Sequence, residues 1–551
     1  MIRSQIQKLL NIPDAVIDRP ENQSFGDYST NAVLKLAKKE GKNPMELAQE
    51  LAQKLSASKS DMFSKIEVAL PGFINFTLSP QFLRQQVQEI LKAKENYGAL
   101  NIGQNKKIQV EFISANPTGP LTLGNGRGGF FGDVLANVLS RAGFSVKREY
   151  FVNDAGFQVE VLGHSVLKDE QAQYKGEYID KLNKKFVCWL CSKDPKKVGQ
   201  KAAKYILAKM LQPTIKDRMK IKFDEWVSEG ALRSSGATDK VLAMLKAKNL
   251  TYEQDGATWF KSTQFGDDKD RVLITSAKDG RDGAATYLLP DAAYHYKKFV
   301  KDKFDKVINI WGADHHGYIL RLQAIKKALN MPGELEVVIM QLVRLMVKGE
   351  EVKMSKRLGT YITLDELLEE IPLDVARFFF LMRAPNTHMD FDLDLAKEQS
   401  QKNPVYYVQY AYARICSILR KAHSTTQSLN DSITDSSGHS ITQSLNHSSE
   451  FALIKQLIRF PEVIEDTAKD YGVHRLPQYS MDLVRSFHKF YEECRVLPAP
   501  PSGPEGPEGS SNGSEEIDEA TSQARLALCE ATRIVLANTL SLMGISAPEK
   551  M

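Results

Sequence analysis

The chain has few cysteines and no long apolar run. Its 551 residues include only 5 Cys, an odd number that cannot form the disulfide framework of a small secreted domain. No stretch approaches the roughly 18 consecutive apolar residues that a membrane span needs. The opening "MIRSQIQKLLNIPD" also lacks the long apolar core of a secretory signal. We therefore expect a soluble, cytoplasmic protein that makes no contact with a membrane.

Two of the cysteines are close in sequence. Cys188 and Cys191 form one CxxC in "CWLC", and no second pair lies near them. A four-cysteine zinc site would need that second pair. We interpret the two residues as reduced packing residues and expect no resident metal, with a redox or zinc role as the alternative.

The excess of positive charge is small and unevenly placed. Lys and Arg number 73 against 68 Asp and Glu, which gives a formal net charge of +5. This permits a polyanionic partner without requiring one. Residues 181–209, however, hold nine lysines and a single acid, Asp194. Both a solvated helix face and a phosphate-binding surface fit that pattern.

Hydrophobic patterning divides the chain into three domains and predicts a multidomain α/β protein. Residues 1–95 form a small α/β unit, in which Asn43 and Pro44 begin a helix. Residues 96–395 alternate strands and helices, as in a Rossmann-like, doubly wound parallel sheet, with a helical insertion at about 160–250. Residues 396–551 read as long amphipathic helices of an all-α bundle.

Two stretches of the last domain have too little apolar surface to fold. The first, at about 423–449, contains the near-repeat "HSTTQSLN" and "HSITQSLN". The second, at about 498–516, is a Pro/Gly/Ser linker that becomes acidic at its end. We predict that both are disordered.

A glycine-rich stretch, "PTGPLTLGNGRGG" at 117–129, precedes an apolar helix predicted over about 128–141. Glycines at a helix N-terminus let a ligand approach the backbone N–H groups, and the helix dipole favours an anion there. The stretch therefore predicts a phosphate site. In a second interpretation, Thr122 and Asn125 only cap the helix.

The same stretch contains a literal GxGxxG formed by Gly124, Gly126 and Gly129, and Glu149 lies twenty residues beyond the last glycine. That pattern is typical of a dinucleotide-binding site. In such a site the first glycine follows the strand directly. Here eleven residues, two of them prolines, separate Phe112 from Gly124, and this spacing favours a different kind of loop.

A second motif, "KMSKR" at 353–357, follows the apolar strand "VVIMQLV" on a glycine-flanked loop. Lysines on such a loop are mobile point charges that can close over a triphosphate. Alone, the motif could be a surface charge run. Its occurrence some 230 residues after the tetrad Thr122-Leu-Gly124-Asn125 makes a nucleotide site the stronger interpretation.

The two motifs resemble the His-x-Gly-His and KMSKS signatures of class I aminoacyl-tRNA synthetases. Nearly the whole chain resembles arginyl-tRNA synthetase, including "VEFISANPTGPL", "REYFVNDAG", "TYLLPDAAYHYKKF", "WGADHHGY" and "SAPEKM". The resemblance implies an arginine–tRNA ligase that converts L-arginine and ATP to arginyl-adenylate and pyrophosphate. The arginine is then transferred to the 3′ end of tRNA(Arg). It also implies Mg²⁺ carried by the nucleotide, and we expect a monomer.

The resemblance assigns residues to each part of the site. The implied catalytic residues are Thr122, Asn125, Lys353 and Lys356. The implied ATP-binding residues are Pro120, Gly124, Arg127, Gly312, His315, Met354 and Ser355. The implied arginine-binding residues are Glu111, Ser114, Asn116, Tyr287, Asp291 and Asp314, with Tyr287 and Asp291 on the guanidinium. If the segment "TYLLPD" is helical, the spacing of four places that tyrosine and aspartate on one face.

The tetrad departs from the family pattern, which usually has His where Thr122 and Asn125 stand. Each replacement can donate one hydrogen bond to phosphate but cannot carry a positive charge. Losing one such donor without compensation costs on the order of 3 kcal/mol in the transition state. We hypothesise that Lys356 and Arg127 carry more of the phosphate charge than in relatives with histidine.

The terminal domains are implied to bind tRNA. Phe73 and Asn75 match family positions that contact the D-loop, and an aromatic ring beside an amide suits an unpaired base. Tyr491 and Met551 are expected at the anticodon, by position alone. Two alternatives remain, a tRNA-binding relative that has lost activation and an oxidoreductase that uses the GxGxxG.

Overall fold

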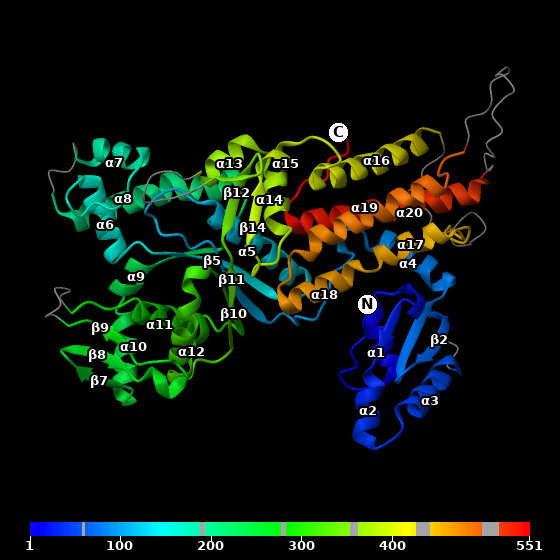
Figure 1. Cartoon of the computed structure of the whole chain (residues 1–551), viewed down its shortest axis with the longest axis horizontal. Helices are drawn as coiled ribbons and strands as arrows, with labels where there is room; N and C mark the ends of the chain where they lie inside the picture. The colour runs from blue at the N-terminus through cyan, green and yellow to red at the C-terminus, as the bar shows by residue number, and fades with distance from the viewer. Residues whose placement is uncertain (58–60, 188–192, 277–282, 353–361, 426–440, 499–516) are drawn as a thin grey trace.

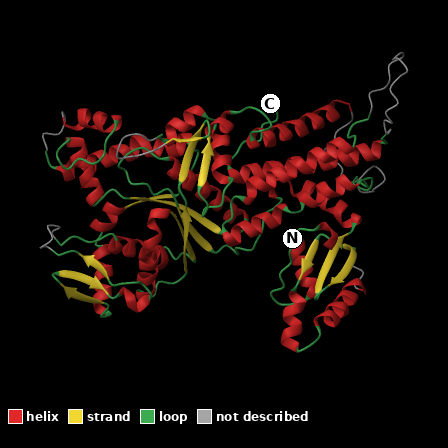
Figure 2. Cartoon of the chain, in the orientation of Figure 1, coloured by secondary structure: helices red, strands yellow, loops and turns green. Residues whose placement is uncertain are grey.

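The computed structural model describes most of the chain, and Figures 1 and 2 show its course and secondary structure. The described residues are 1–57, 61–187, 193–276, 283–352, 362–425, 441–498 and 517–551. The motif lysines of 353–357 and the pair Cys188 and Cys191 lie outside them. In Figure 1 the N-terminal domain, in blue, lies against the orange and red C-terminal helices, far from helices α6 to α8.

The N-terminal domain is a small α/β unit, as predicted. Its helices are α1 (Ile2–Leu10), α2 (Ala32–Glu40) and α3 (Pro44–Ala57). They accompany a three-stranded antiparallel sheet in the order β1 (Tyr28–Thr30), β3 (Phe73–Leu78), β2 (Phe63–Ala69). Helix α3 begins at Pro44, where the sequence predicted it, and Asn43 Oδ1 accepts from the N–H of Met45 at 2.9 Å. The next helix, α4 (Pro80–Ala93), leads to the central domain.

The central domain is built on a parallel sheet of five strands, which confirms the doubly wound fold. The strand order is β11 (Glu334–Met340), β10 (Lys306–Gly312), β4 (Lys107–Glu111), β5 (Ser145–Val152), β6 (Glu225–Ser228). From β4 the chain winds first toward β6 and later toward β11. In such sheets ligands bind at the carboxyl ends of the strands, where the winding direction changes. That position lies between β4 and β10.

The predicted insertion at 160–250 is helical only in part. Helices α6 (Phe157–Leu167), α7 (Glu177–Val187) and α8 (Pro195–Ile206) occupy its first half, followed by π-helical turns over 207–211 and 214–218. Strand β6 then adds the fifth strand to the main sheet, so the prediction of a helical insertion is wrong for this part of it. Helices α9 (Glu229–Ser234) and α10 (Ala237–Ala247) follow it. A strand of four residues is too short to show a clear alternation in the sequence.

Helix α5 (Leu123–Arg141) connects β4 to β5 and lies in the core of the domain. It begins at Leu123, five residues before the predicted start, because the glycine-rich stretch forms its first turns. Gly132 allows its close approach to the sheet, since a Cβ there would lie 2.3 Å from Cγ of Phe112.

Two smaller sheets complete the central domain. One is antiparallel, in the order β7 (Thr251–Gln254), β8 (Ala257–Phe260), β9 (Arg271–Ile274). The other contains β13 (Glu350–Val352), β12 (Val343–Val347) and β14 (Met389–Asp392). The predicted strand "VVIMQLV" therefore divides between two sheets, because β11 ends at Met340 and β12 begins at Val343. The remaining helices are α11 (Leu288–Tyr296), α12 (Ile319–Ala328), α13 (Leu364–Glu370), α14 (Leu373–Leu381) and α15 (Leu393–Lys397).

The C-terminal domain is a bundle of long helices, as predicted. These are α16 (Pro404–Thr425), α17 (Ser448–Leu457), α18 (Phe460–Asp470), α19 (Arg475–Glu493) and α20 (Glu519–Met543). Among the described residues, only α20 is long and apolar enough to cross a membrane, by length and composition alone. Of its apolar window 78% is buried inside the protein, as is usual for a core helix.

Part of the segment predicted to be disordered is ordered. Thr442 and Leu445, in the second copy of the near-repeat, are completely buried. Arg84 of α4 donates from Nε to the Leu445 carbonyl at 2.8 Å, and the Thr442 hydroxyl donates to the Arg84 carbonyl at 3.3 Å. The prediction of disorder is thus wrong for 441–449, and also for 423–425, which form the end of α16. Composition did not reveal that these side chains pack against another domain. Residues 426–440 and 499–516 lie outside the described ranges.

A buried ion pair joins the N-terminal domain to α18. Arg19 Nε donates to one carboxylate oxygen of Glu462 and the Tyr28 hydroxyl to the other, each at 2.7 Å. Tyr28 and Glu462 are both buried, and burial raises the pKa of Tyr28 well above its usual range. Because unpaired charges are costly in an interior, this pair fixes how the two terminal domains sit against each other.

We predict that Glu462→Ala loosens this contact. Removing the carboxylate leaves Arg19, whose side chain is only 20% exposed, without its acidic partner, which costs about 3–5 kcal/mol. Hydrogen exchange of the backbone amides of β1 and α18 should become faster. Glu50→Ala is the matched control, because Glu50 of α3 is exposed and pairs with Lys54 at the surface, and such pairs contribute about 0–1 kcal/mol. Equal exchange in the two variants would contradict the assigned role of the buried pair.

Candidate active site

The tetrad forms the first turn of α5. Thr122 is the N-cap, and its Oγ1 accepts from the N–H of Asn125 at 3.4 Å. In return, Asn125 Oδ1 accepts from the N–H of Thr122 at 3.0 Å and from its hydroxyl at 2.9 Å. The two residues therefore cap the helix, as the second interpretation held. The cap uses only the amide oxygen of Asn125, so within the described part of the chain its Nδ2 group has no acceptor and can donate to a ligand.

The end of the KMSKR loop lies beside the tetrad. Residues 353–361 follow β13 directly, and the described chain resumes at Ile362. Thr363 forms an isolated β-bridge with Thr122, and the N–H of Leu364 donates to the Leu121 carbonyl at 2.9 Å. Lys353, Met354, Ser355 and Lys356 themselves lie outside the described residues. The flank of their loop is nevertheless anchored at the N-terminus of α5.

Arg127 faces the interior, which corrects its predicted contact with phosphate. Its guanidinium is fully buried and donates to the carbonyls of Gln341 and Ala384 at 2.8 Å and of Thr387 at 2.9 Å. Burial lowers its pKa to about 10. The side chain therefore ties α5 to the segments after β11 and α14.

The other predicted nucleotide-binding residues of the described chain lie near the carboxyl ends of β4 and β10 or in the loops that follow these strands. Gly124 is exposed, and a Cβ there would have only Thr122 Oγ1 within 4 Å, at 3.8 Å. Pro120 and Thr363 line a cavity of about 450 Å³. Gly312 ends β10. His315 follows on a short 3-10 helix, with its side chain largely exposed.

Three carboxylates gather around the start of α11. Glu111 ends β4, Glu229 follows β6 and Asp291 lies in the first turn of α11. Burial, together with the charges of Glu111 and Glu229, raises the pKa of Asp291 to about 7, although the Tyr318 hydrogen bond and the charge of Lys298 act in the opposite direction. Such a desolvated group of acids favours a bound cation.

Tyr287 and Asp291 have the predicted helical spacing. The N–H of Asp291 donates to the Tyr287 carbonyl at 3.2 Å, so both belong to one helical turn. The Tyr287 side chain is accessible, with 52% of the residue exposed. Burial of its hydroxyl and the charge of Glu229 raise its pKa. The phenol and the carboxylates therefore face one region.

Glu229 is a site residue that sequence reasoning missed. Only 2% of it is exposed, and burial raises its pKa. Arg233 donates to its Oε1 from Nε at 2.9 Å and from Nη2 at 2.6 Å, whereas Oε2 has no partner among the described residues. An acid directly after a strand could have signalled it, but β6 had been assigned to a helical insertion.

The residues after β4 are placed as a group at the same edge. Ser114 donates from Oγ to Glu111 Oε1 at 3.0 Å, and Asn116 donates from Nδ2 to the Gln158 side chain. Asp314 differs from the expectation. Its side chain is 79% exposed and lies 3.4 Å from His315 Nε2, so it points to solvent rather than lining the acidic group.

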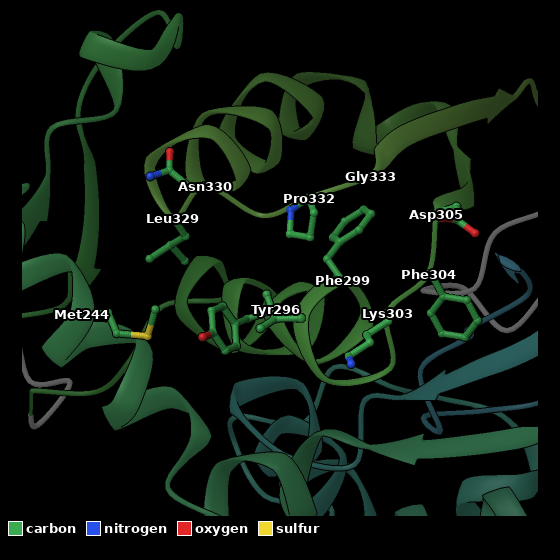
Figure 3. Close-up of a pocket in the computed structure, with 11 residues that line it drawn as sticks. Met244, Tyr296, Phe299, Lys303, Phe304, Asp305, Leu329, Asn330, Pro332 and Gly333 are labelled. Carbon is green, nitrogen blue, oxygen red and sulfur yellow. The ribbon is translucent and has the colours of Figure 1, made fainter. Parts of the chain in front are cut away.

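A separate cavity of about 520 Å³ lies at the opposite edge of the sheet. Figure 3 shows Tyr296, Phe299 and Lys303 on its near wall and Pro332 and Gly333 above them. Its other boundary residues include Asp305, directly before β10. None of the predicted site residues that the structure describes lines it.

The predicted tRNA contacts differ in exposure. Phe73 is partly buried at the start of β3, and Asn75 is buried, with its Oδ1 accepting from the Ser29 hydroxyl at 2.7 Å. Tyr491 is partly buried and carries the Arg414 guanidinium 4.6 Å from its ring centre. Met551 is exposed.

Three family models match the chain in order. Residues 1–78 match the arginyl tRNA synthetase N terminal domain. Residues 86–177 and 164–379 match the class I (R) tRNA synthetase catalytic domain, and residues 408–551 match the DALR anticodon binding domain.

Curated relatives match over nearly the full length. The arginine–tRNA ligase of Bacillus subtilis is 42% identical over 100% of this chain and 97% of its own. Arginine–tRNA ligase 1 of Halalkalibacterium halodurans is also 42% identical, over 98% of this chain and 95% of its own.

Solved structures share the fold. The arginyl-tRNA synthetase of Thermus thermophilus superposes with a TM-score of 0.76 at 22% identity, covering 100% of both chains. That of Plasmodium falciparum gives 0.73 at 21% identity, covering 100% of this chain and 99% of that one. The domain order, the site and the full-length identity agree, and the chain belongs to the arginyl-tRNA synthetases of class I.

Proposed function

We propose that this chain ligates L-arginine to tRNA(Arg) with ATP, through arginyl-adenylate, at the carboxyl edge of the five-stranded sheet. The observation that carries the proposal is the group of three carboxylates, the buried Glu111 and Glu229 and the partly buried Asp291, on the chain segments next to the helix start that bears the tetrad. A guanidinium is a planar cation with several donors, and such a group of acceptors suits it.

The two ends of the amino acid would occupy different parts of this edge. Asp291, Glu229 and the Tyr287 phenol would bind the guanidinium. Glu111 and Asn116 would bind the α-amino group. The substrate carboxylate would then point toward the first turn of α5, where the nucleotide phosphates bind.

Activation needs positioning and charge stabilisation rather than a nucleophilic side chain. The substrate carboxylate attacks the α-phosphorus in line, the new C–O–P bond forms and the bond to pyrophosphate breaks. The N–H groups at the start of α5 and the Asn125 amide donate to phosphate oxygens. Lys356 and Lys353 neutralise the leaving pyrophosphate, and Mg²⁺ arrives on the nucleotide.

The terminal domains would bind the tRNA. The N-terminal domain would contact the D-loop, and the helical domain would read the anticodon near Tyr491 and Met551. We propose a cytoplasmic monomer without a membrane contact.

An oxidoreductase that uses the GxGxxG is disfavoured. A Cβ on Gly126 would lie 2.7 Å from Leu364, and one on Gly129 would lie 2.6 Å from Met219. These glycines are explained by packing against neighbouring segments. A tRNA-binding relative without activation is disfavoured because the acidic residues remain in place.

Charging of tRNA with radiolabelled arginine tests the proposal. We expect arginine-dependent charging, and ATP–pyrophosphate exchange only when tRNA is present, because activation in this family generally requires bound tRNA. Binding of tRNA without either activity would instead support the relative that has lost activation.

Lys356→Ala should lower the rate of exchange by about 100- to 1000-fold, the range seen when one preorganised transition-state donor is removed. Lys348→Ala, which removes a lysine from the turn between β12 and β13, is the control and should exchange at the wild-type rate. Exchange near the wild-type rate in Lys356→Ala would exclude its role on pyrophosphate.

The raised pKa of Asp291 predicts a pH dependence. Below pH 7 the free enzyme holds a proton on Asp291 that a bound guanidinium displaces, so kcat/KM for arginine should rise about tenfold per pH unit up to pH 7 and then level. The unliganded fold, which binds this proton more tightly than the unfolded chain, should lose stability as pH rises from about 4 to 7. Asp291→Asn should remove the arginine slope. The kcat/KM for ATP is the internal reference, and an equal slope for both substrates would argue against Asp291.

A further inference from the structure

A chain of buried polar side chains runs behind the acidic group. His295 of α11, Asn309 of β10 and Lys298 are at most 2% exposed. Lys298 lies where α11 widens into a π-helical turn over Lys297–Lys301, a feature frequent at functional sites. The mechanism above uses none of the three. A buried ammonium is costly unless it is fully paired, so its partners matter.

The lysine fixes the direction of every hydrogen bond in this chain. An ammonium only donates, so the Asn309 oxygen that lies 3.3 Å from Lys298 Nζ is an acceptor. The Asn309 amide nitrogen therefore faces His295 Nε2, at 2.9 Å, and donates to it. His295 then carries its proton on Nδ1 and donates it to the backbone carbonyl of Asp291, at 2.8 Å. Burial and the charge of Lys298 lower the pKa of His295, which agrees with a neutral ring.

The other end of the chain is Glu111. Lys298 Nζ donates to Glu111 Oε2 at 2.6 Å, while Ser114 Oγ donates to Oε1 at 3.0 Å. The ammonium also lies 4.0 Å from the ring centre of Tyr294. Both carboxylate oxygens are thus held from the protein side. A carboxylate oxygen can accept more than one hydrogen bond, so Glu111 keeps acceptor capacity for a substrate ammonium.

We propose that Lys298 is a positioning residue for the amino acid substrate. Through Glu111 it orients the carboxylate that binds the α-ammonium, and through Asn309 and His295 it holds the backbone carbonyl of Asp291. One buried ammonium therefore sets the placement of the amino-group site relative to the guanidinium site. The inference rests on the proposed function, in which Glu111 and Asp291 bind those two groups.

Lys298→Met keeps the length of the side chain and removes its charge. In aminoacylation of tRNA(Arg), KM for arginine should rise about 10- to 100-fold, as expected for a lost charge-assisted hydrogen bond. The KM for ATP and kcat should change by no more than about threefold, within the usual context dependence of such effects. The matched control is Lys297→Met, because Lys297 pairs with Asp302 and Glu225 at the outer side of the helix. It should leave all three constants near wild type.

An arginine analogue without the α-amino group, 5-guanidinopentanoate, separates positioning from general damage. As a competitive inhibitor it should bind wild type more weakly than arginine, because it cannot use Glu111. Its inhibition constant should rise in Lys298→Met by less than the KM for arginine does, because arginine uses both sites that Lys298 places and the analogue uses only one. The preference for arginine should therefore fall in the variant. Equal weakening of arginine and analogue would show a purely structural role and overturn the inference.

A second variant tests the proposal if Lys298→Met does not fold. The double variant Glu111→Gln/Lys298→Met removes both charges, so no unpaired charge stays buried. It should bind the analogue about as Lys298→Met does and show no preference for arginine. Failure of both variants to fold would assign the pair to stability alone and overturn the proposal.

The same assays distinguish failure of the inference from failure of the proposed site. If wild type prefers arginine and both variants keep that preference, only the role of Lys298 is wrong. If wild type charges tRNA with arginine yet binds the analogue as tightly, Glu111 is not the amino-group site, and both proposals fall together.

Discussion

The proposed amino acid site at the carboxyl edge of the five-stranded sheet depends on one electrostatic constraint. More negative than positive charge is removed from solvent around Asp291. Arg233 pairs with Glu229 and Lys298 with Glu111, so two of the three carboxylates have a cation of the protein. Among the described residues no cation is paired with Asp291, and burial is the main reason why its pKa rises to about 7. A desolvated acid without a counter-ion is destabilising unless it is protonated or a ligand supplies the charge. In the proposed function, a guanidinium bound there would replace a proton on Asp291.

Strand β4 also leads to a region that attracts anions, at the start of α5. β4 ends in Glu111, and the chain that leaves it becomes α5, whose first N–H groups and dipole attract an anion. A cation-binding and an anion-binding region are therefore separated by about a dozen residues of loop. An amino acid bound by its cationic groups presents its carboxylate toward the phosphates. The doubly wound topology, by placing β10 next to β4, brings the start of α11 to the same edge.

Local patterns predicted what depends on local structure. The sequence predicted the helical turn that carries Tyr287 and Asp291. It also predicted the strand, loop and helix around the glycine-rich stretch. Both depend on local residue spacing and not on tertiary packing. Arg127 was misassigned because a cation in a glycine-rich helix start suits phosphate equally well in sequence, and only packing shows that it faces inward. Glu229 was missed because a four-residue strand leaves no periodic signal. Order in 441–449 was missed because burial of Thr442 and its neighbours depends on α4, more than 350 residues earlier.

The direction of the tetrad hydrogen bonds explains how Thr122 and Asn125 can replace two histidines. The reciprocal cap fixes the Asn125 side chain through its oxygen, so its amide nitrogen is oriented toward the ligand without further ordering when a phosphate binds. What the pair cannot supply is positive charge. Arg127 cannot supply it either, because its guanidinium is committed to three carbonyls. In the proposed mechanism the charge that balances the leaving pyrophosphate must therefore come from another segment. The bridge between Thr122 and Thr363 holds Thr363, six residues after the KMSKR motif, beside the tetrad. Residues 353–357 contain the lysines that meet this requirement.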